Sequence, residues 1–324
     1  MLTGVVGLTE NVVEIDQVSK DYGEIRAVDR VSLSIERGEI FGLIGHNGAG
    51  KTTLFRLMLG LMPPTSGAIR IDGQPVRGEA FRKVRRRIGY LPENVVLYDN
   101  LTALETLWFF ADLKSVQRSS ALPVLEKVGL GHAAARRVRG FSKGMRQRLG
   151  FAQAMLGQPS LLFLDEPTTG LDPEGIREFY GILSEMRGLG VTAILSSHIL
   201  AEIQQRVDRL ALMNEGRIYA LGTVQSLRRA ANLQLQVTVS PRPGILDALQ
   251  RRLAEAGIRQ LRVNGGQVHI ECPQEGKMAL LDTLSHMGDQ VADIQIHEPS
   301  LEDIFHGYAV AHWPANAGEG GRAP

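Results

Sequence analysis

The chain has 324 residues, which is long enough for two domains that each bury a core of their own. Lys and Arg number 36 against 35 Asp and Glu, so the formal net charge is +1 and no overall field favours nucleic acid. The single cysteine, Cys272, excludes an internal disulfide, and the sequence contains no apolar run long enough to span a bilayer.

Alternating apolar strands and helical stretches between residues 12 and 230 predict an α/β domain with a largely parallel sheet. The segments 161–164 and 192–195 are continuous apolar runs, which are typical of strands buried on both faces. The other expected strands cover residues 12–18, 27–35, 40–44, 67–71, 88–91 and 209–214.

The pattern changes after residue 231. An alternating strand, an amphipathic helix, two strands joined by the turn Asn264-Gly265-Gly266, a second helix and a last strand are expected in turn. This βαββαβ order predicts a small ferredoxin-like α+β domain over residues 231–308, which we expect to assist dimerisation. The residues 309–324 are rich in Ala, Gly and Pro and are expected to be disordered.

A phosphate loop of the form GxxxxGK[ST] lies between the apolar stretch 40–44 and a helical stretch at 53–58. Its glycines allow positive φ and leave no Cβ, so consecutive N–H groups can surround phosphate oxygens at a helix N-terminus. Lys51 is expected to reach the β- and γ-phosphates, and the Thr52 hydroxyl to bind Mg²⁺. The motif predicts nucleoside triphosphate binding by Gly45, His46, Asn47, Gly48, Ala49, Gly50, Lys51, Thr52 and Thr53.

Two carboxylates follow the apolar strand at 161–164. Asp165 stands at the carboxyl end of that strand, where it can hold the hydration shell of Mg²⁺. Glu166 is expected to face the γ-phosphate and to orient or deprotonate the attacking water. Because they accompany a phosphate loop, these acids predict hydrolysis as well as binding.

A second helix start lies between these elements, at Phe141-Ser142-Lys143-Gly144-Met145. Ser is a residue type that caps helix N-termini, and Gly144 permits close backbone approach. With this segment the chain resembles the ATP-binding cassette (ABC) ATPases over roughly residues 12–230. The LSGGQ signature of that family corresponds to Phe141–Met145, with Ser142 and Gly144 retained.

The resemblance assigns roles to residues that are unremarkable alone. It implies that Tyr22 stacks on adenine and that Asp172 belongs to the D-loop, Gly170-Leu171-Asp172-Pro173. It also implies that His198, in Ser196-Ser197-His198, contacts the γ-phosphate. We therefore expect Lys51, Glu166 and His198 to be catalytic.

One position departs from the family pattern. Glu93, in Gly89-Tyr90-Leu91-Pro92-Glu93-Asn94, stands where the family usually has Gln. Its carboxylate can still bind Mg²⁺ through oxygen and adds negative charge near the metal. The expected metal ligands are therefore Thr52, Glu93 and Asp165.

The resemblance also implies an ABC-type P-loop NTPase fold with a helical signature subdomain, ATP as substrate and Mg²⁺ as cofactor. Two copies would close head to tail, with each ATP between the phosphate loop of one copy and the Ser142/Gly144 helix of the other. A separate transmembrane permease dimer is the expected partner, with no nucleic acid. The implied location is the cytoplasmic face of the bacterial inner membrane.

Longer strings suggest a subgroup. Residues 45–53, 90–95, 142–150 and 294–305 resemble the ATPases of nitrous oxide reductase maturation, the NosF group. That resemblance implies service to copper-site assembly with a NosY-like permease and a NosD-like periplasmic protein. The wider class of ATPases that serve ABC-2-type exporters of drugs, ions or lipids shares several of these strings, so it stays the alternative. With one Cys and scattered His, the chain itself is not expected to bind copper.

Two other classes are less favoured. Soluble ABC proteins that act on nucleic acid or ribosomes usually carry two cassettes, and this chain has one. A non-catalytic regulatory module would not need Lys51, Thr52, Asp165, Glu166 and His198. Two basic runs, Arg82-Lys83-Val84-Arg85-Arg86-Arg87 and Arg136-Arg137-Val138-Arg139, are expected to be solvated helix faces, and contact with nucleotide, a partner or anionic lipid is the alternative.

Overall fold

The computed structural model describes residues 10–231, 234–258 and 261–297. The chain forms two compact units, and the first ends at Gly222. The expected tail at 309–324 lies outside the described residues, as does most of the string at 294–305. Within the described ranges, no helix has both the length and the apolar character that crossing a membrane requires.

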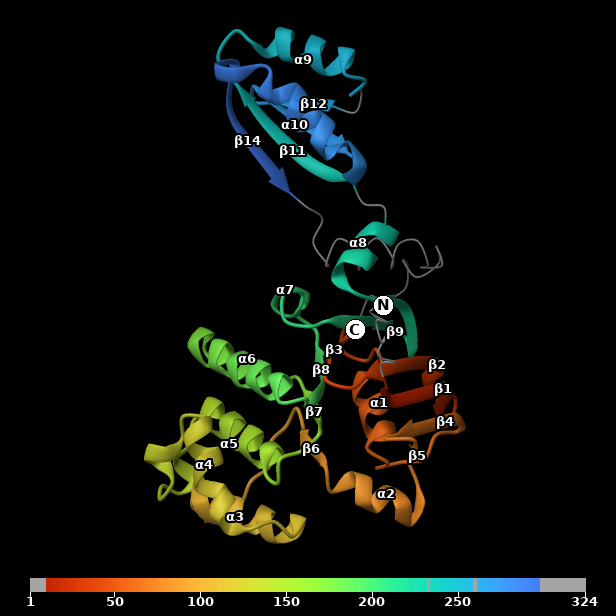
Figure 1. Ribbon diagram of the computed structural model, residues 1–324, viewed down its shortest axis with the longest axis vertical. Coiled ribbons are helices and arrows are strands. Elements are labelled where there is room, and N and C mark those ends of the chain that lie inside the picture. Colours follow the sequence, from red (N-terminus) through yellow and green to blue (C-terminus); the bar gives the residue numbers. More distant parts are fainter. Residues whose placement is uncertain (1–9, 232–233, 259–260, 298–324) are drawn as a thin grey trace, which may run out of the picture. The chain divides into compact units, whose positions relative to one another are not determined.

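The centre of the first unit is a six-stranded sheet in the order β10-β9-β3-β8-β7-β6 (Figure 1). Five of its strands run parallel, and only β10 is antiparallel to its neighbour. The strands β3, β7 and β8 are buried along their whole length, as their continuous apolar sequences predict. The bounds are β3 Ile40–Ile44, β6 Ile88–Leu91, β7 Leu161–Asp165, β8 Thr192–Ser197, β9 Arg209–Asn214 and β10 Arg217–Gly222.

The expectation of one largely parallel sheet is incomplete, because three of the expected strands belong to a second sheet. This sheet is antiparallel, in the order β2-β1-β4-β5. Its strands show alternating burial along parts of their length, since one face packs on the core and the other meets solvent. The bounds are β1 Asn11–Tyr22, β2 Ile25–Glu36, β4 Ser66–Ile71 and β5 Gln74–Pro75.

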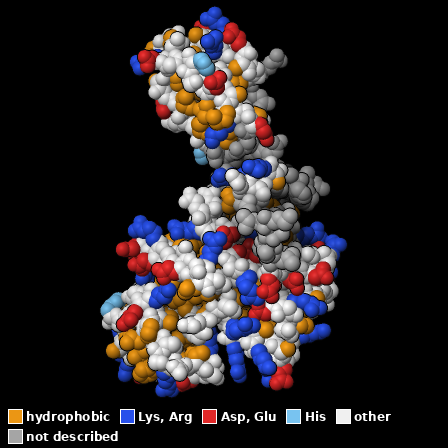
Figure 2. Space-filling model, viewed as in Figure 1, with side chains coloured by type: hydrophobic (Ala, Val, Ile, Leu, Met, Phe, Trp, Pro, Cys, Tyr) orange, Lys and Arg blue, Asp and Glu red, His pale blue; other side chains and the backbone are white. Residues whose placement is uncertain are grey.

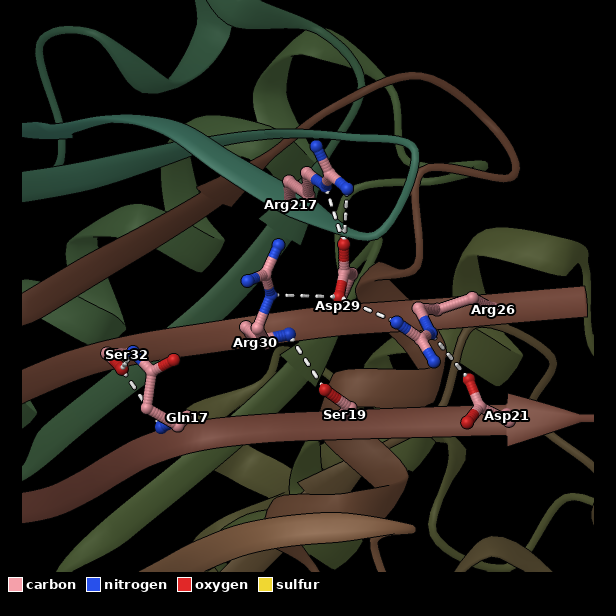
Figure 3. A network of polar contacts seen from close by, with 8 residues as sticks. All are labelled: Gln17, Ser19, Asp21, Arg26, Asp29, Arg30, Ser32 and Arg217. Atoms are coloured by element: carbon pink, nitrogen blue, oxygen red, sulfur yellow. Dashed lines mark hydrogen bonds and ion pairs between the residues drawn. The ribbon is translucent and has the colours of Figure 1, made fainter.

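A buried carboxylate joins the two sheets (Figure 3). Asp29 on β2, whose side chain is 4% exposed, accepts from Arg217 on β10 at 2.6 Å and is also paired with Arg26 and Arg30. The backbone N–H of Asp29 donates to the carbonyl of Gly216. These contacts hold the segment around residue 27 against the edge of the parallel sheet.

Helices cover the parallel sheet and form a separate helical group beside it (Figure 1). In that group, α3 begins with a full capping box, in which Thr102 and Glu105 each bond the other's backbone. The helices of the first unit are α1 Lys51–Met58, α2 Gly78–Arg85, α3 Ala103–Lys114, α4 Ala121–Lys127, α5 Lys143–Met155, α6 Pro173–Gly188 and α7 Leu200–Ile203.

The second unit has a βαββαβ core with sheet order β12-β13-β11-β14, which is the ferredoxin-like arrangement. Apolar side chains from β11, β13 and both core helices form its hydrophobic centre, including Val237, Leu249, Ile270 and Leu280. A helix, α8, precedes this core. The bounds are α8 Val224–Ala231, β11 Leu235–Pro241, α9 Leu246–Glu255, β12 Leu261–Asn264, β13 Gln267–Cys272, α10 Lys277–Ser285 and β14 Val291–His297.

One lysine links α3 to the end of α5. Lys114 Nζ donates to the carbonyl oxygens of Leu156, at 3.1 Å, and Ala154, at 3.5 Å. Burial lowers the pKa of this ammonium to about 8, whereas a lysine in an unfolded chain titrates near about 10.4. Between these two values the unfolded state binds more protons, so this group makes the free energy of unfolding rise with pH.

Replacing Lys114 with Met should remove this titration. We expect the stability of the native chain, relative to Lys114→Met, to increase above pH 8 by at most about 1.4 kcal/mol per pH unit. Urea unfolding at several pH values between about 7.5 and 9.5 measures it. Lys83→Met, at an exposed position, is the control. If the difference in free energy of unfolding between the native chain and Lys114→Met stays constant with pH, the lowered pKa of Lys114 is wrong.

Candidate functional site

The carboxyl ends of the central parallel strands bring the expected site residues together. The register pairs Ile44 of β3 with Ser197 of β8, and Asp165 of β7 with Ser196 of β8. The phosphate loop leaves β3 at this edge, and the acidic pair leaves β7 there. Segments more than 100 residues apart in sequence thus meet at one edge of the sheet, where parallel α/β sheets bind ligands.

Backbone crowding explains the glycines of the phosphate loop. A Cβ on Gly45 would lie 2.2 Å from the carbonyl oxygen of Met213, and one on Gly50 would lie 2.4 Å from that of Ala27. Gly50 also has a φ of 101°, which only glycine adopts without strain. No side chain caps the start of α1, so its first N–H groups are left for a ligand, and a helix N-terminus favours anions.

The loop holds its lysine in a buried position. Lys51 is 6% exposed, and its Nζ donates to the carbonyl oxygens of Gly45, at 2.6 Å, and His46, at 3.1 Å. Burial lowers the pKa of this ammonium, against the opposing charges of Glu166, Asp165 and Glu93. His46 also contacts the Asn214 side chain, while His46, Asn47 and Gly48 remain exposed at the mouth of the loop.

The two acids converge because the chain turns after β7. Successive strand side chains point to opposite faces, so neighbours such as Asp165 and Glu166 would normally diverge. Glu166 has a φ of 47°, in the left-handed region, which rotates its side chain back toward the lysine. Its Oε1 lies 3.7 Å from Lys51 Nζ, and its Oε2 lies 2.8 Å from His198 Nδ1. A strained backbone of this kind is common at functional sites.

Polar atoms in this cluster have unused bonding capacity. Asp165 Oδ2 and Glu166 Oε1 are buried without a hydrogen-bond partner in the structure. Both lie near the ammonium of Lys51 and the uncapped start of α1. Unpaired carboxylate oxygens can bind Mg²⁺ as ligands and can accept a hydrogen bond from a polarised water, so the residues present fit an Mg²⁺–nucleotide complex.

The signature residues form a second, separate group. Ser142 caps α5 by accepting from Met145 N, and Asp172 caps α6 by accepting from Gly175 N. These two helix starts border a surface groove of about 580 Å³, lined also by Lys143, Gly144, Met145, Gly170 and Leu171. Among the described residues, no hydrogen bond or ion pair joins this groove to the phosphate loop of the same chain.

Two expected residues lie at the margins of the first group. Tyr22 ends β1 and is 45% exposed; its hydroxyl lies 3.0 Å from Met62 Sδ, and Lys20 Nζ lies 5.5 Å from its ring centre. Its flat ring is therefore open on the surface, as stacking requires. Glu93 is exposed after β6, close enough for its charge to act on Lys51.

Sequence reasoning missed two positioning contacts. Ser196, fully buried, donates to Asp165 Oδ1 at 2.5 Å and accepts from Glu166 N at 3.0 Å, so it orients both acids. Gln147 on α5 is buried and donates to the carbonyl of Pro167 at 2.9 Å. The sequence did offer a signal for Ser196, which ends an apolar strand two residues before His198. It offered no local signal for Gln147.

Known proteins share this architecture. Residues 28–169 match the ABC transporter family. The chain is 36% identical over 299 residues to the bacitracin transport ATP-binding protein BcrA of Bacillus licheniformis, across 91% of this chain and 96% of BcrA. It is 32% identical over 315 residues to the daunorubicin resistance ATP-binding protein DrrA3 of Streptomyces coeruleorubidus, across 92% and 96% of the two chains.

A solved structure agrees with these sequence relatives. It is a dimeric ATP-binding cassette in a post-hydrolysis state bound to ADP and Pi, and it is 26% identical to this chain with a TM-score of 0.61. The similarity covers 65% of this chain and 98% of that cassette. The chain therefore belongs to the ATP-binding proteins of ABC transporters, a family that hydrolyses ATP.

Proposed function

We propose that this chain is the ATP-hydrolysing subunit of a drug or antibiotic exporter, in which it drives a separate transmembrane permease. The cluster of Lys51, Asp165, Glu166 and His198 supports the chemistry. The relatedness to BcrA and DrrA3 supports the transport role, because the alignments cover more than nine-tenths of this chain and so include part of the second unit.

Each residue of the cluster has a distinct part in hydrolysis. The loop N–H groups and Lys51 hold the phosphates of ATP. Glu166 orients a water and accepts its proton as the oxygen attacks the γ-phosphorus, and the bond to the β–γ bridging oxygen breaks to give ADP and phosphate. His198 donates from Nδ1 to Glu166 and so steadies that carboxylate; in the imidazolium form its other ring nitrogen can donate to the γ-phosphate as well.

The metal site is part of the same proposal. Thr52, Asp165 and Glu93 are the residues that would hold Mg²⁺, which neutralises charge on the phosphate oxygens when bound. Asp165 brings the unpartnered Oδ2, and Ser196 occupies its other oxygen, so the carboxylate is already oriented.

A second copy completes the site. One phosphate loop leaves part of a triphosphate exposed, and the Ser142/Gly144 helix start, which borders an open groove, is a second site that suits an anion. Head-to-tail closure of two chains would place each signature groove on the other chain's nucleotide. Tyr22 would then stack on adenine at the open edge.

An apolar surface on the helical group suits the permease. Val96, Tyr98, Phe109 and Leu113 are 87%, 58%, 38% and 66% exposed, and the rings of Tyr98 and Phe109 meet edge to face. Figure 2 shows hydrophobic side chains gathered over α3 and α4. An exposed apolar patch of this kind marks a protein-binding surface. We place it against the permease at the cytoplasmic face of the inner membrane.

Copper-site maturation with NosY- and NosD-like partners is the less favoured function. It rests on short strings that exporter ATPases share, whereas the relatives named above transport bacitracin or confer daunorubicin resistance. One experiment in cells separates the two functions. The gene for this chain is deleted in its host, and the strain is complemented with the gene for either the native chain or the Glu166→Gln variant.

The exporter proposal predicts a rise in susceptibility to a bacitracin-type peptide or an anthracycline on deletion, reversed only by the native chain. Growth inhibition across a concentration series measures it, and nitrous oxide reductase activity should not change. Unchanged susceptibility together with a copper-deficient reductase would instead support the maturation function.

Glu166→Gln should separate binding from hydrolysis. The amide keeps the size of the side chain but cannot accept the proton, so we expect steady-state ATP turnover to fall by about 10²-fold or more. ATP should still bind and hold a dimer, which size-exclusion chromatography detects. Lys51→Ala is the contrasting variant, since it should lose both nucleotide binding and the dimer. If the Glu166→Gln variant turned over ATP at the native rate, Glu166 would not be the general base.

Mixing two inactive chains should test head-to-tail closure. Lys51→Ala disables the phosphate loop, and Ser142→Asp keeps a capping residue on α5 while placing negative charge in the signature groove. Each variant alone should be inactive. Their mixture should recover activity, because one of the two sites in the mixed dimer unites a native loop with a native signature. ATPase assays of a titrated mixture measure it, and no recovery would exclude shared sites.

A further inference from the structure

One basic surface of the first unit has no part in nucleotide binding. Between Arg77 and Arg87 the chain has six basic residues and one acidic residue, Glu79. Most of this segment is α2, whose Phe81 and Val84 are buried against the core. Arg82, Lys83 and Arg86 lie on the opposite side and are exposed, because the spacing i, i+1 and i+4 places them on one helix face.

The acidic residue on the same helix as these three cations is Glu79, and no ion pair joins it to them among the described contacts. Arg87 pairs with Asp72, and Arg85 donates to the carbonyl of Gly60 and lies over the Phe81 ring. Within the described residues, Arg82, Lys83 and Arg86 form no ion pair or side-chain hydrogen bond. Like charges held this close repel one another, so the face loses stability in isolation and gains it beside an anionic surface.

The other basic run is partly engaged within the chain, which makes it a useful comparison. Arg136 donates to the carbonyl of Gly140 and lies over the Phe141 ring. The charge of Arg137 acts on Glu105, and the backbone N–H of Arg139 donates to the backbone carbonyl of Asp99. Two of the three arginine side chains thus have a partner within the chain, whereas the described structure gives the three exposed α2 side chains none.

We propose that the exposed face of α2 contacts the headgroups of anionic phospholipids in the membrane that holds the permease. Figure 1 places α2 at the same end of the first unit as α3, which carries the apolar surface assigned to the permease. Figure 2 shows Lys and Arg side chains along that end. The inference rests on the proposed permease contact for this orientation, because a subunit docked through that end presents α2 to the bilayer surface.

The chemistry of the face favours lipid over a compact ligand. A row of unpaired cations on one short helix suits a layer of lipid phosphate groups. Each cation can attract a phosphate group there without a fixed contact geometry. Juxtamembrane basic side chains are attracted to an anionic bilayer, and this attraction weakens with salt over a Debye length. The contact would orient the ATPase on the membrane before or while it meets the permease.

Vesicle co-sedimentation of the full-length chain tests the proposal. The native chain should bind vesicles that contain roughly a third phosphatidylglycerol, and bind far less to pure phosphatidylcholine. The triple variant Arg82→Gln/Lys83→Gln/Arg86→Gln should lower the partition coefficient by about a hundredfold, at about fivefold for each charge. Binding should also be lost at about 0.5 M salt.

A matched control removes the same net charge elsewhere. Arg136→Gln/Arg137→Gln/Arg139→Gln should keep most of the vesicle binding, and an equal loss would show that net charge, not α2, is responsible. Tight retention on a DNA duplex with no vesicle binding would also overturn the proposal. ATP turnover without vesicles should be native in the α2 variant. Because that assay needs no lipid, failure of lipid binding and failure of the ATPase assignment are distinguishable.

Discussion

A buried ammonium facing two buried carboxylates is the interaction on which the first unit depends. Lys51, Asp165 and Glu166 are all less than a tenth exposed, and each would be costly to bury alone. The ammonium offsets one of the two carboxylate charges, and two carboxylate oxygens remain without hydrogen bonds. The cluster therefore keeps both a positive group and free carboxylate oxygens with which it can bind a ligand.

The parallel sheet makes this arrangement possible. Its strands deliver side chains to one edge in a fixed register, and the second, antiparallel sheet supports the loop from the other side through Ala27. The Asp29 network holds that supporting segment in place. Packing against neighbouring strands thus sets the shape of the phosphate loop, because a Cβ on Gly45 or Gly50 would meet a backbone carbonyl oxygen first.

Sequence predicted the parts whose signal is local. The phosphate loop, the buried strands β3, β7 and β8 and the order of elements in the second unit follow from motifs and from runs of apolar residues. Strand β10 was missed, because its apolar residues, Ile218 to Leu221, are consecutive and too few to show a period. The antiparallel sheet was missed as a separate unit, since β1 pairs with β4 across more than 40 residues and pairing at that distance has no local signature. Gln147 could not be found for the same reason.

The register of β7 against β8 has a further consequence. Asp165 pairs with Ser196, and the turn at Glu166 follows at once. A single residue inserted into β7 would move the side chains that follow it to the opposite face and put Asp165 in the place of Glu166. Exchanges among apolar residues of similar volume within this strand keep the register, whereas a change in its length would lose it. A family alignment should show substitutions between residues 161 and 164 and no insertion or deletion there.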